Sequence, residues 1–326
     1  MSWYGAVGRP LFFAVEPETS HRMALALLGL PLPWERIGGS VDEPSLRTTL
    51  AGIPLANPIG LAAGFDKDCR RLDALGRLGF GYVVGGTITL APREGNPRRR
   101  IARDRRSRAI VNAMGMPNVG ARAASATLSR TPRASPRLVS LADEALDDVL
   151  AAAELVESQV DGFELNASSP NAGWGHGADH VGTVVDALAS RTDKPVFVKL
   201  SPFGNDEEQG GVLAMAATAK EGGAAGLTCS NSRPVRDARM STGRGGLSGG
   251  PLTRATPSIV AAVREATGLP INACGGVFTA DEARACLRAG ATSVQVYTGL
   301  VYRGPGIVGE LTRGLARRAP DPAGAR

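Results

Sequence analysis

The feature that most constrains the fold is an alternation, after residue 55, of short apolar or β-branched runs with longer alanine-rich stretches. This pattern is typical of repeated βα units, in which each strand is followed by a helix. Eight strand-like runs can be counted, at 57–63, 81–85, 138–141, 162–166, 196–200, 226–229, 271–274 and 293–297. The helices expected after them include 143–158, 206–221, 280–289 and 307–318.

Eight βα units predict an α/β protein with a (β/α)8 TIM barrel, and the length of 326 residues suits one such domain. The alternative is a doubly wound open sheet. No predicted strand is followed by a GxGxxG motif with an acidic residue about 20 positions later, so the barrel is favoured.

The segment before the barrel differs in character. An apolar run at 10–15 is followed by a helix start at 17–20 and an amphipathic stretch at 21–28 that ends at Gly29. Two short helices are expected, which either cap the barrel or place an apolar face in a membrane interface. We therefore divide the chain into an N-terminal helical extension (1–50), a barrel (51–319) and a disordered tail (320–326).

Composition excludes several classes of protein. No apolar run approaches the roughly 18 residues that a membrane span requires. The four cysteines are scattered, without CxxC spacing or a preceding secretory signal, so we predict a reducing, cytoplasmic setting with no metal site. The net charge of +6 comes largely from arginines at 98–108, which we interpret as a solvated basic loop rather than a nucleic-acid site, because aromatic residues are not interleaved.

Polar or glycine-rich residues follow most of the predicted strands, and in a barrel these strand ends share one mouth. The richest is Asn166-Ala167-Ser168-Ser169-Pro170-Asn171, where two hydroxyls and amide side chains could converge on a small polar ligand or could instead form a local turn. After the last two strands, Gly275-Gly276 and Tyr297-Thr298-Gly299 suggest that backbone N–H groups bind a phosphorylated cofactor.

Several of these motifs, in this order, resemble the dihydroorotate dehydrogenases, and specifically the quinone-using class 2 enzymes. The resemblance covers nearly the whole chain. It rests on the segments 17–21, 57–67, 94–98, the SSPN element at 168–171, 246–249 and 294–299. It implies an FMN-binding barrel, in agreement with the strand count.

The resemblance also implies a reaction, in which dihydroorotate loses a proton from C5 to a base and a hydride from C6 to FMN, within de novo pyrimidine (UMP) biosynthesis. Ser169 is the expected base, and Lys67 is expected to stabilise the developing negative charge. The implied substrate-binding residues are Lys67, Asn112, Met114, Gly115, Met116, Asn166, Asn171, Asn231 and Ser232. The implied FMN-binding residues are Ala62, Ala63, Gly64, Thr87, Ser140, Asn166, Lys199, Ser230, Gly249, Gly275, Gly276, Tyr297 and Thr298.

A quinone is the implied electron acceptor, entering between the N-terminal helices near His21 and Arg103. The expected location is cytoplasmic, peripheral to the inner face of the cell membrane; the oligomeric state stays open, a monomer included. Ser140 at the third strand end and Ala172 after Asn171 depart from the family pattern. An alternative is therefore a divergent flavin-binding barrel that acts on another dihydropyrimidine or lacks catalysis.

Overall fold

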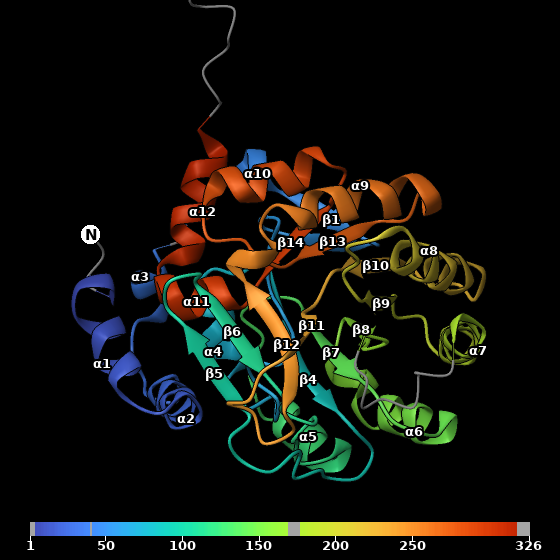
Figure 1. Cartoon of the computed structure of the whole chain (residues 1–326), viewed down its shortest axis with the longest axis horizontal. Helices are drawn as coiled ribbons and strands as arrows, with labels where there is room; N and C mark the ends of the chain where they lie inside the picture. The colour runs from blue at the N-terminus through green and yellow to red at the C-terminus, as the bar shows by residue number, and fades with distance from the viewer. Residues whose placement is uncertain (1–3, 40, 169–176, 318–326) are drawn as a thin grey trace, which may run out of the picture.

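Eight parallel strands close into a barrel at the centre of the molecule (Figure 1). The structure is a computed structural model that describes residues 4–39, 41–168 and 177–317. The predicted site residues Ser169 and Asn171 and the predicted tail 320–326 lie outside the described residues. In chain order the barrel strands are β3 (Ile59–Leu61), β4 (Tyr82–Ile88), β7 (Arg137–Leu141), β8 (Gly162–Leu165), β9 (Val196–Leu200), β10 (Gly226–Cys229), β13 (Ile271–Cys274) and β14 (Ser293–Val296).

All eight predicted strands are present, and the (β/α)8 prediction is confirmed. Each strand pairs with the next in the sequence, and β14 pairs with β3 to close the ring. Every residue of these strands is buried. Helices cover the outer face and side chains fill the inner face, which explains why the strands read as apolar runs rather than as alternating patterns.

Helices surround the barrel (Figure 1). They are α4 (Leu72–Arg77), α5 (Ala121–Leu128), α6 (Leu146–Val156), α7 (Ala178–Ala189), α8 (Asp206–Glu221), α9 (Ala255–Thr267), α10 (Ala280–Arg288), α11 (Thr298–Arg303) and α12 (Ile307–Ala316), with short turns η3 (Glu157–Gln159) and η5 (Gly250–Leu252). Local signals explain their starts. Asn205 caps α8 through its side chain, and Thr279 with Glu282 forms a capping box at α10.

A second, four-stranded sheet lies beside the barrel and was not predicted. Its order is β11-β12-β6-β5, with β5 (Ile101–Asp104), β6 (Ala109–Asn112), β11 (Arg233–Arg236) and β12 (Arg244–Gly249). The basic segment 98–108 consists of β5, the residues before it and the turn that leads into β6, and its Arg98, Arg99, Arg105, Arg106 and Arg108 are exposed. The interpretation as a solvated segment holds for these arginines, although residues 101–104 form a strand rather than a loop. Several of its arginines bind carbonyl or carboxylate oxygens of the N-terminal segment, a contact that charge alone does not reveal.

The N-terminal segment forms η1 (Tyr4–Gly8), α1 (Arg9–Ala14), α2 (Pro17–Leu27), α3 (Trp34–Gly38), η2 (Pro44–Leu46) and the hairpin β1 (Thr48–Leu50) with β2 (Ile53–Leu55). Figure 1 shows α1 and α2, in blue, at one side of the molecule near β5 and α11. The β1–β2 hairpin packs on the barrel itself, away from α1 and α2. Its Leu50, Ile53 and Leu55 pack with barrel residues Tyr82 and Phe197, and so close one end of the barrel interior.

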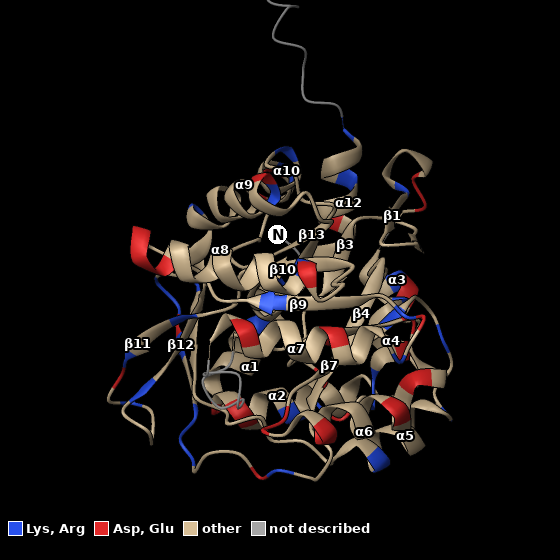
Figure 2. Cartoon of the chain, turned by 90° about the vertical axis from the view of Figure 1, so that its right-hand side faces the viewer, with Lys and Arg blue, Asp and Glu red and all other residues tan. Residues whose placement is uncertain are grey.

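Charged residues are spread over the surface, whereas exposed large hydrophobic residues are concentrated in the N-terminal segment. Figure 2 shows acidic and basic residues interspersed over the outer helices. Among the described residues, the strongly exposed large hydrophobic side chains all lie between residues 7 and 41. None of the helices in 4–39, 41–168 or 177–317 combines the length and the apolar character needed to cross a membrane.

Candidate active site

One cavity of about 1270 Å³ joins the mouth of the barrel to the N-terminal helices. Its barrel side is lined by Lys67, Asn166, Lys199 and Asn231, and its other side by residues of α1, α2 and α3 such as Phe13, His21 and Trp34. Small-molecule sites in proteins typically have volumes of about 300–1,000 Å³. The cavity thus has room for more than one ligand.

The cavity collects most of the predicted site residues. From the predicted substrate group it is lined by Lys67, Asn112, Met114, Gly115, Met116, Asn166, Asn231 and Ser232. From the predicted FMN group it is lined by Ala62, Ala63, Gly64, Thr87, Asn166, Lys199, Gly249, Gly275, Gly276, Tyr297 and Thr298. His21 and Arg103, predicted for the quinone, line it as well. Ser140 and Ser230 are fully buried and lie behind its surface.

A continuous chain of hydrogen bonds crosses the rim of the barrel. Asn231 Nδ2 donates to Ser168 Oγ (2.7 Å), and Ser168 Oγ donates to Asn166 Oδ1 (2.8 Å). Asn166 Nδ2 in turn donates to Thr87 Oγ1 (3.1 Å), which is 2.9 Å from Ser140 Oγ. These contacts fix the orientation of both asparagine amides. Ser168, one of the two hydroxyls of the predicted polar cluster, is thus the link between them.

Lys67 follows β3 and is a cation with few partners. Its Nζ donates to the Gly64 carbonyl oxygen at 2.6 Å. Burial, with a smaller contribution from the Arg100 charge, lowers the pKa of Lys67 to about 8. An anion bound in the cavity would favour the charged form, so this lysine is suited to hold a carboxylate near neutral pH.

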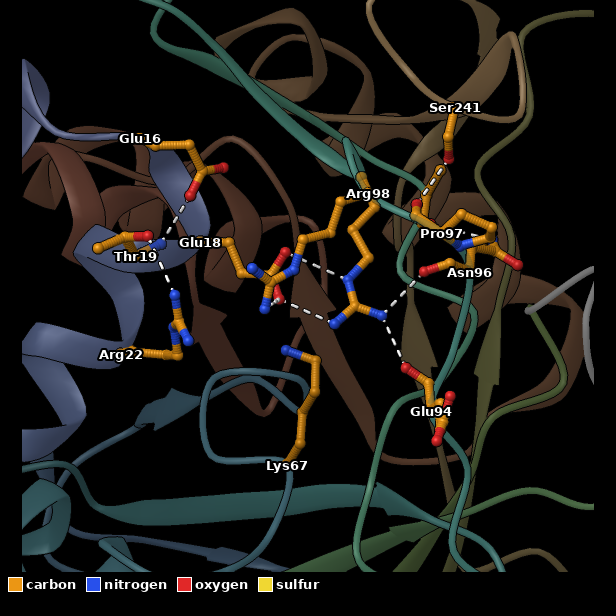
Figure 3. A network of polar contacts seen from close by, with 12 residues as sticks. Glu16, Glu18, Thr19, Arg22, Lys67, Glu94, Asn96, Pro97, Arg98 and Ser241 are labelled. Carbon is orange, nitrogen blue, oxygen red and sulfur yellow. Dashed lines mark hydrogen bonds and ion pairs between the residues drawn. The ribbon is translucent and has the colours of Figure 1, made fainter.

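A buried ion pair links α2 to the same region. Arg100 donates to both carboxylate oxygens of Glu18, at 2.8 and 3.2 Å, and Arg98 lies 3.7 Å from one of them. Figure 3 shows the Lys67 side chain extending toward this group. Hydrogen bonds from Arg100 hold the pKa of Glu18 below its usual value. The N-terminal helix is therefore anchored directly beside Lys67.

Lys199 on β9 is the second cation of the cavity, and its surroundings differ from those of Lys67. Its Nζ lies 3.3 Å from Glu164 Oε1 and 3.5 Å from Gln295 Oε1. Burial alone would lower the pKa of Lys199, but the nearby Cys274 sulfur and Glu164 carboxylate outweigh burial and raise it. Burial also raises the pKa of the Cys274 thiol, so this thiol stays neutral near pH 7.

The glycine turn after β13 has the backbone conformation that was expected of a ligand-binding loop. Gly275 and Gly276 have φ values of 125° and 72°, in the region that favours glycine. A Cβ on Gly276 would lie 2.3 Å from the Thr253 backbone nitrogen, so no larger residue fits there. Opposite this turn, Ser248 Oγ and Thr298 Oγ1 are 3.0 Å apart, and both residues line the cavity.

The N-terminal side of the cavity is aromatic and apolar. The His21 ring packs edge-on against Phe65 at 5.0 Å, and Phe65 packs against Tyr297 at 5.7 Å. Burial and the Lys67 charge lower the pKa of His21 to about 3, so this imidazole is neutral under physiological conditions. Arg103 stacks on Phe13 at 4.4 Å and donates to the backbone carbonyls of Phe12 (3.0 Å) and Val15.

Sequence reasoning missed residues of two kinds. Glu164 and Gln295 are polar residues within strands, and Glu164 is visible as a carboxylate in an otherwise apolar run. The Glu18–Arg100 pair joins positions 82 residues apart, and no local signal predicts it.

Comparison with known proteins identifies the family. A family model described as dihydroorotate dehydrogenase matches residues 45–318. The chain belongs to the dihydroorotate dehydrogenase family. The predicted resemblance and the predicted oxidoreductase class are thereby confirmed.

Individual relatives agree over nearly the full length. The chain is similar to a dihydroorotate dehydrogenase (quinone) of Sphingopyxis alaskensis, at 37% identity over 98% of this chain and 94% of that protein. A protein of the same description from Verminephrobacter eiseniae is 36% identical over 95% of this chain and 94% of its own length. Among solved structures, DHODH of Eimeria tenella in complex with ferulenol superposes with a TM-score of 0.80, at 31% identity, over 92% of this chain and 90% of that one.

Proposed function

We propose that this protein oxidises (S)-dihydroorotate to orotate in de novo pyrimidine biosynthesis, with FMN as cofactor and a quinone as electron acceptor. The observation that carries the proposal is the single cavity, with amides and cations at the barrel mouth and aromatic and apolar side chains between the N-terminal helices. A polar substrate and a lipophilic acceptor need different surroundings, and the two sides of the cavity supply them.

The barrel mouth provides the substrate site. Lys67 would bind the carboxylate of dihydroorotate, and the amides of Asn112, Asn166 and Asn231 would bind its ring N–H and C=O groups. The chain from Asn231 through Ser168 to Thr87 holds two of these amides in place before the substrate arrives. Such preorganisation lowers the cost of reaching the reactive geometry.

Ser169 would remove the C5 proton of the substrate. A serine hydroxyl is a weak base, so this role needs a relay for the proton and a site from which water is excluded. The assignment to Ser169 follows the resemblance to the family, and the neighbouring Ser168 is hydrogen-bonded to Asn166 and Asn231.

The residues at the barrel mouth fit FMN. The Ser230 hydroxyl, which is buried next to the cavity-lining Asn231, has no hydrogen-bond partner among the described residues, and Lys199 provides an ammonium group in the cavity. Lys199 and Ser230 would bind the ring system, and the glycine turn 275–276 with Thr298 would bind the phosphate. FMN, when bound, supplies a hydride acceptor for C6 of the substrate and an electron donor for the quinone.

The N-terminal helices would bring the quinone from a membrane surface. Val7, Leu11, Leu27, Leu30 and Leu32 are all exposed apolar side chains on or near these helices. Exposed apolar groups gathered on one element mark an interaction site, and a lipid interface is the partner that also stores quinone. The enzyme would then lie on the inner face of the cell membrane, with its barrel in the cytoplasm.

The proposal is tested with purified protein. Under anaerobic conditions dihydroorotate should bleach the yellow flavin, and a short-chain ubiquinone or menaquinone should restore its colour. Protein that cannot be reconstituted with FMN would refute the proposal. Flavin that is not bleached by dihydroorotate but is bleached by another dihydropyrimidine would show that the substrate differs.

A further inference from the structure

A chain of buried polar side chains crosses the interior of the barrel, below the cavity. Tyr82 OH is 2.7 Å from Ser293 Oγ, and Ser293 Oγ donates to Asn272 Oδ1 at 2.7 Å. Asn272 Nδ2 donates to Thr228 Oγ1 (3.2 Å), and Thr228 Oγ1 donates to Glu164 Oε2 (2.8 Å). The chain thus runs through five strands, β4, β14, β13, β10 and β8, and ends on a carboxylate.

The direction of these bonds is fixed by simple counting. Each hydroxyl has a single hydrogen to donate. Because Ser293 donates its hydrogen to Asn272, Tyr82 must be the donor to Ser293. Every bond from Tyr82 onward therefore points toward Glu164.

Glu164 accepts at both of its oxygens. Oε2 accepts hydrogen bonds from Thr228 Oγ1 and from Gln295 Nε2 (3.0 Å). Oε1 accepts one from Lys199 Nζ (3.3 Å). All three of these partners donate to Glu164. If the carboxyl group carried a proton, none of them would accept it in this arrangement. Glu164 thus acts as the acceptor in all three bonds, which is the pattern of a carboxylate, and aligned chains of this kind strengthen each bond within them.

Lys199 and Gln295 are the two partners of Glu164 that line the cavity, and Lys199 is the charged one. Its side chain is 4% exposed and that of Glu164 is 0% exposed, so the ion pair is almost completely shielded from water. Lys199 lines the cavity, whereas Glu164 does not. A charge at Glu164 can therefore act on a cavity ligand mainly through the state of Lys199.

We propose that Glu164 is a positioning residue that holds Lys199 as an ammonium ion at the floor of the cavity, so that the charge offered to the cofactor does not change with pH. The inference rests on the proposed function, because Lys199 is expected to contact FMN. The four residues of the chain behind Glu164 hold the carboxylate in place.

The charged and polar groups around Lys199 come from several strands. They are Glu164 on β8, Thr228 on β10, Asn272 and Cys274 on β13, Gln295 on β14 and, at the far end of the chain, Tyr82 on β4. Burial raises the pKa values of the Cys274 thiol and the Tyr82 hydroxyl, so both groups stay neutral near pH 7. Removing the Glu164 charge would therefore leave Lys199 buried without a counter-ion.

The first test measures FMN binding to apoprotein by quenching of flavin fluorescence, from about pH 7 to about pH 9. For the wild type, the dissociation constant should stay constant over this interval. In Glu164→Gln, burial without a counter-ion lowers the pKa of Lys199, so the ammonium donor is lost as the pH rises. The dissociation constant of this variant should increase about tenfold or more across the interval, as expected for loss of a charged hydrogen bond.

A second readout needs no cofactor. In Glu164→Gln the unfolded chain holds the Lys199 proton to higher pH than the folded chain does, so stability should rise with pH. The melting temperature of this apoprotein, relative to the wild type, should therefore increase from about pH 7 to about pH 9. A protein that binds no FMN would contradict the proposed function, while this measurement would still decide the role of Glu164.

Two further variants separate electrostatics from packing. Tyr82→Phe removes the far donor but leaves the ion pair, and should keep the pH-independent behaviour of the wild type. Adding Lys199→Met to Glu164→Gln removes the titrating group, and should abolish the pH dependence. If Glu164→Gln does not fold, Glu164→Asp should show a smaller change in the same direction. A pH-independent Glu164→Gln protein, or pH dependence that persists in the double variant, would overturn the inference.

Discussion

The two sides of the cavity are stabilised in opposite ways. On the barrel side, polar side chains bind one another in defined directions, as in the chain from Asn231 through Asn166 to Thr87 and in the chain that ends at Glu164. On the N-terminal side, aromatic and apolar side chains line the space, and the bonds made by Arg103 go to backbone carbonyls. The barrel side therefore orients a polar ligand. The N-terminal side mainly selects an apolar ligand.

This difference indicates that the two sides of the cavity serve different half-reactions, the oxidation of dihydroorotate and the reoxidation of the flavin. Proton and hydride transfer depend on geometry and charge, which the rigid barrel strands hold in place. Electron transfer to a quinone needs close approach and an apolar path, which short helices can provide. Substitutions on the barrel side should thus change the oxidation of dihydroorotate, and those on the other side should change the reoxidation of the flavin.

The largest effect is expected at Ser169. Ser169→Ala should slow anaerobic flavin reduction by dihydroorotate by about 10²–10⁴-fold, the usual contribution of a general base, without loss of FMN. Stopped-flow absorbance measures this step. Ser168→Ala is the matched control and should cost about tenfold, because it removes hydrogen bonds to Asn166 and Asn231 but no base. If Ser168→Ala were the more damaging change, the base would be misassigned.

A smaller effect, with a pH signature, is expected at Lys67. Its pKa of about 8 means that the free enzyme loses this ammonium as the pH rises through 8, so kcat/KM for dihydroorotate should fall above that pH. Lys67→Met should lower kcat/KM by about 10–100-fold at neutral pH, the value of a charged hydrogen bond. The fall near pH 8 should vanish in this variant, and its persistence there would assign the titration to another group.

On the other side of the cavity, Arg103→Ala should affect only the second half-reaction. The change removes the bonds to Phe12 and Val15 and the stacking on Phe13, which together hold α1 against β5. Reoxidation of reduced flavin by a soluble quinone should slow by about tenfold, the value of one or two lost hydrogen bonds. Flavin reduction by dihydroorotate should not change. Arg106→Ala, at an exposed neighbouring position, is the control.

The sequence predicted the barrel strands and their polar ends better than the contacts between residues far apart in the chain. Barrel strands are recognisable because burial on both faces makes them continuous apolar runs, and their polar ends predict a common mouth. By contrast, the strand at 101–104 was not recognised within the basic segment 98–108, and the contacts of Arg100 and Arg103 with the N-terminal segment join residues far apart in the chain. Glu164 was also missed, since its partners come from three other strands and only the closed ring brings them together.

The smallest effect is expected at Leu11, which is 66% exposed on α1 and does not line the cavity. If the N-terminal helices contact lipid, Leu11→Glu should reduce sedimentation with phosphatidylglycerol–phosphatidylethanolamine vesicles, because it replaces an apolar contact with a charge that anionic lipid repels. Leu11→Ser, which removes only the apolar contact, should reduce binding by about three- to tenfold, the value of one partly buried leucine. Turnover with a water-soluble quinone should be unchanged in both variants. Vesicle binding equal to that of the wild type in Leu11→Glu would mean that this face of α1 contacts something other than lipid, and would restrict the apolar role of the N-terminal helices to lining the cavity.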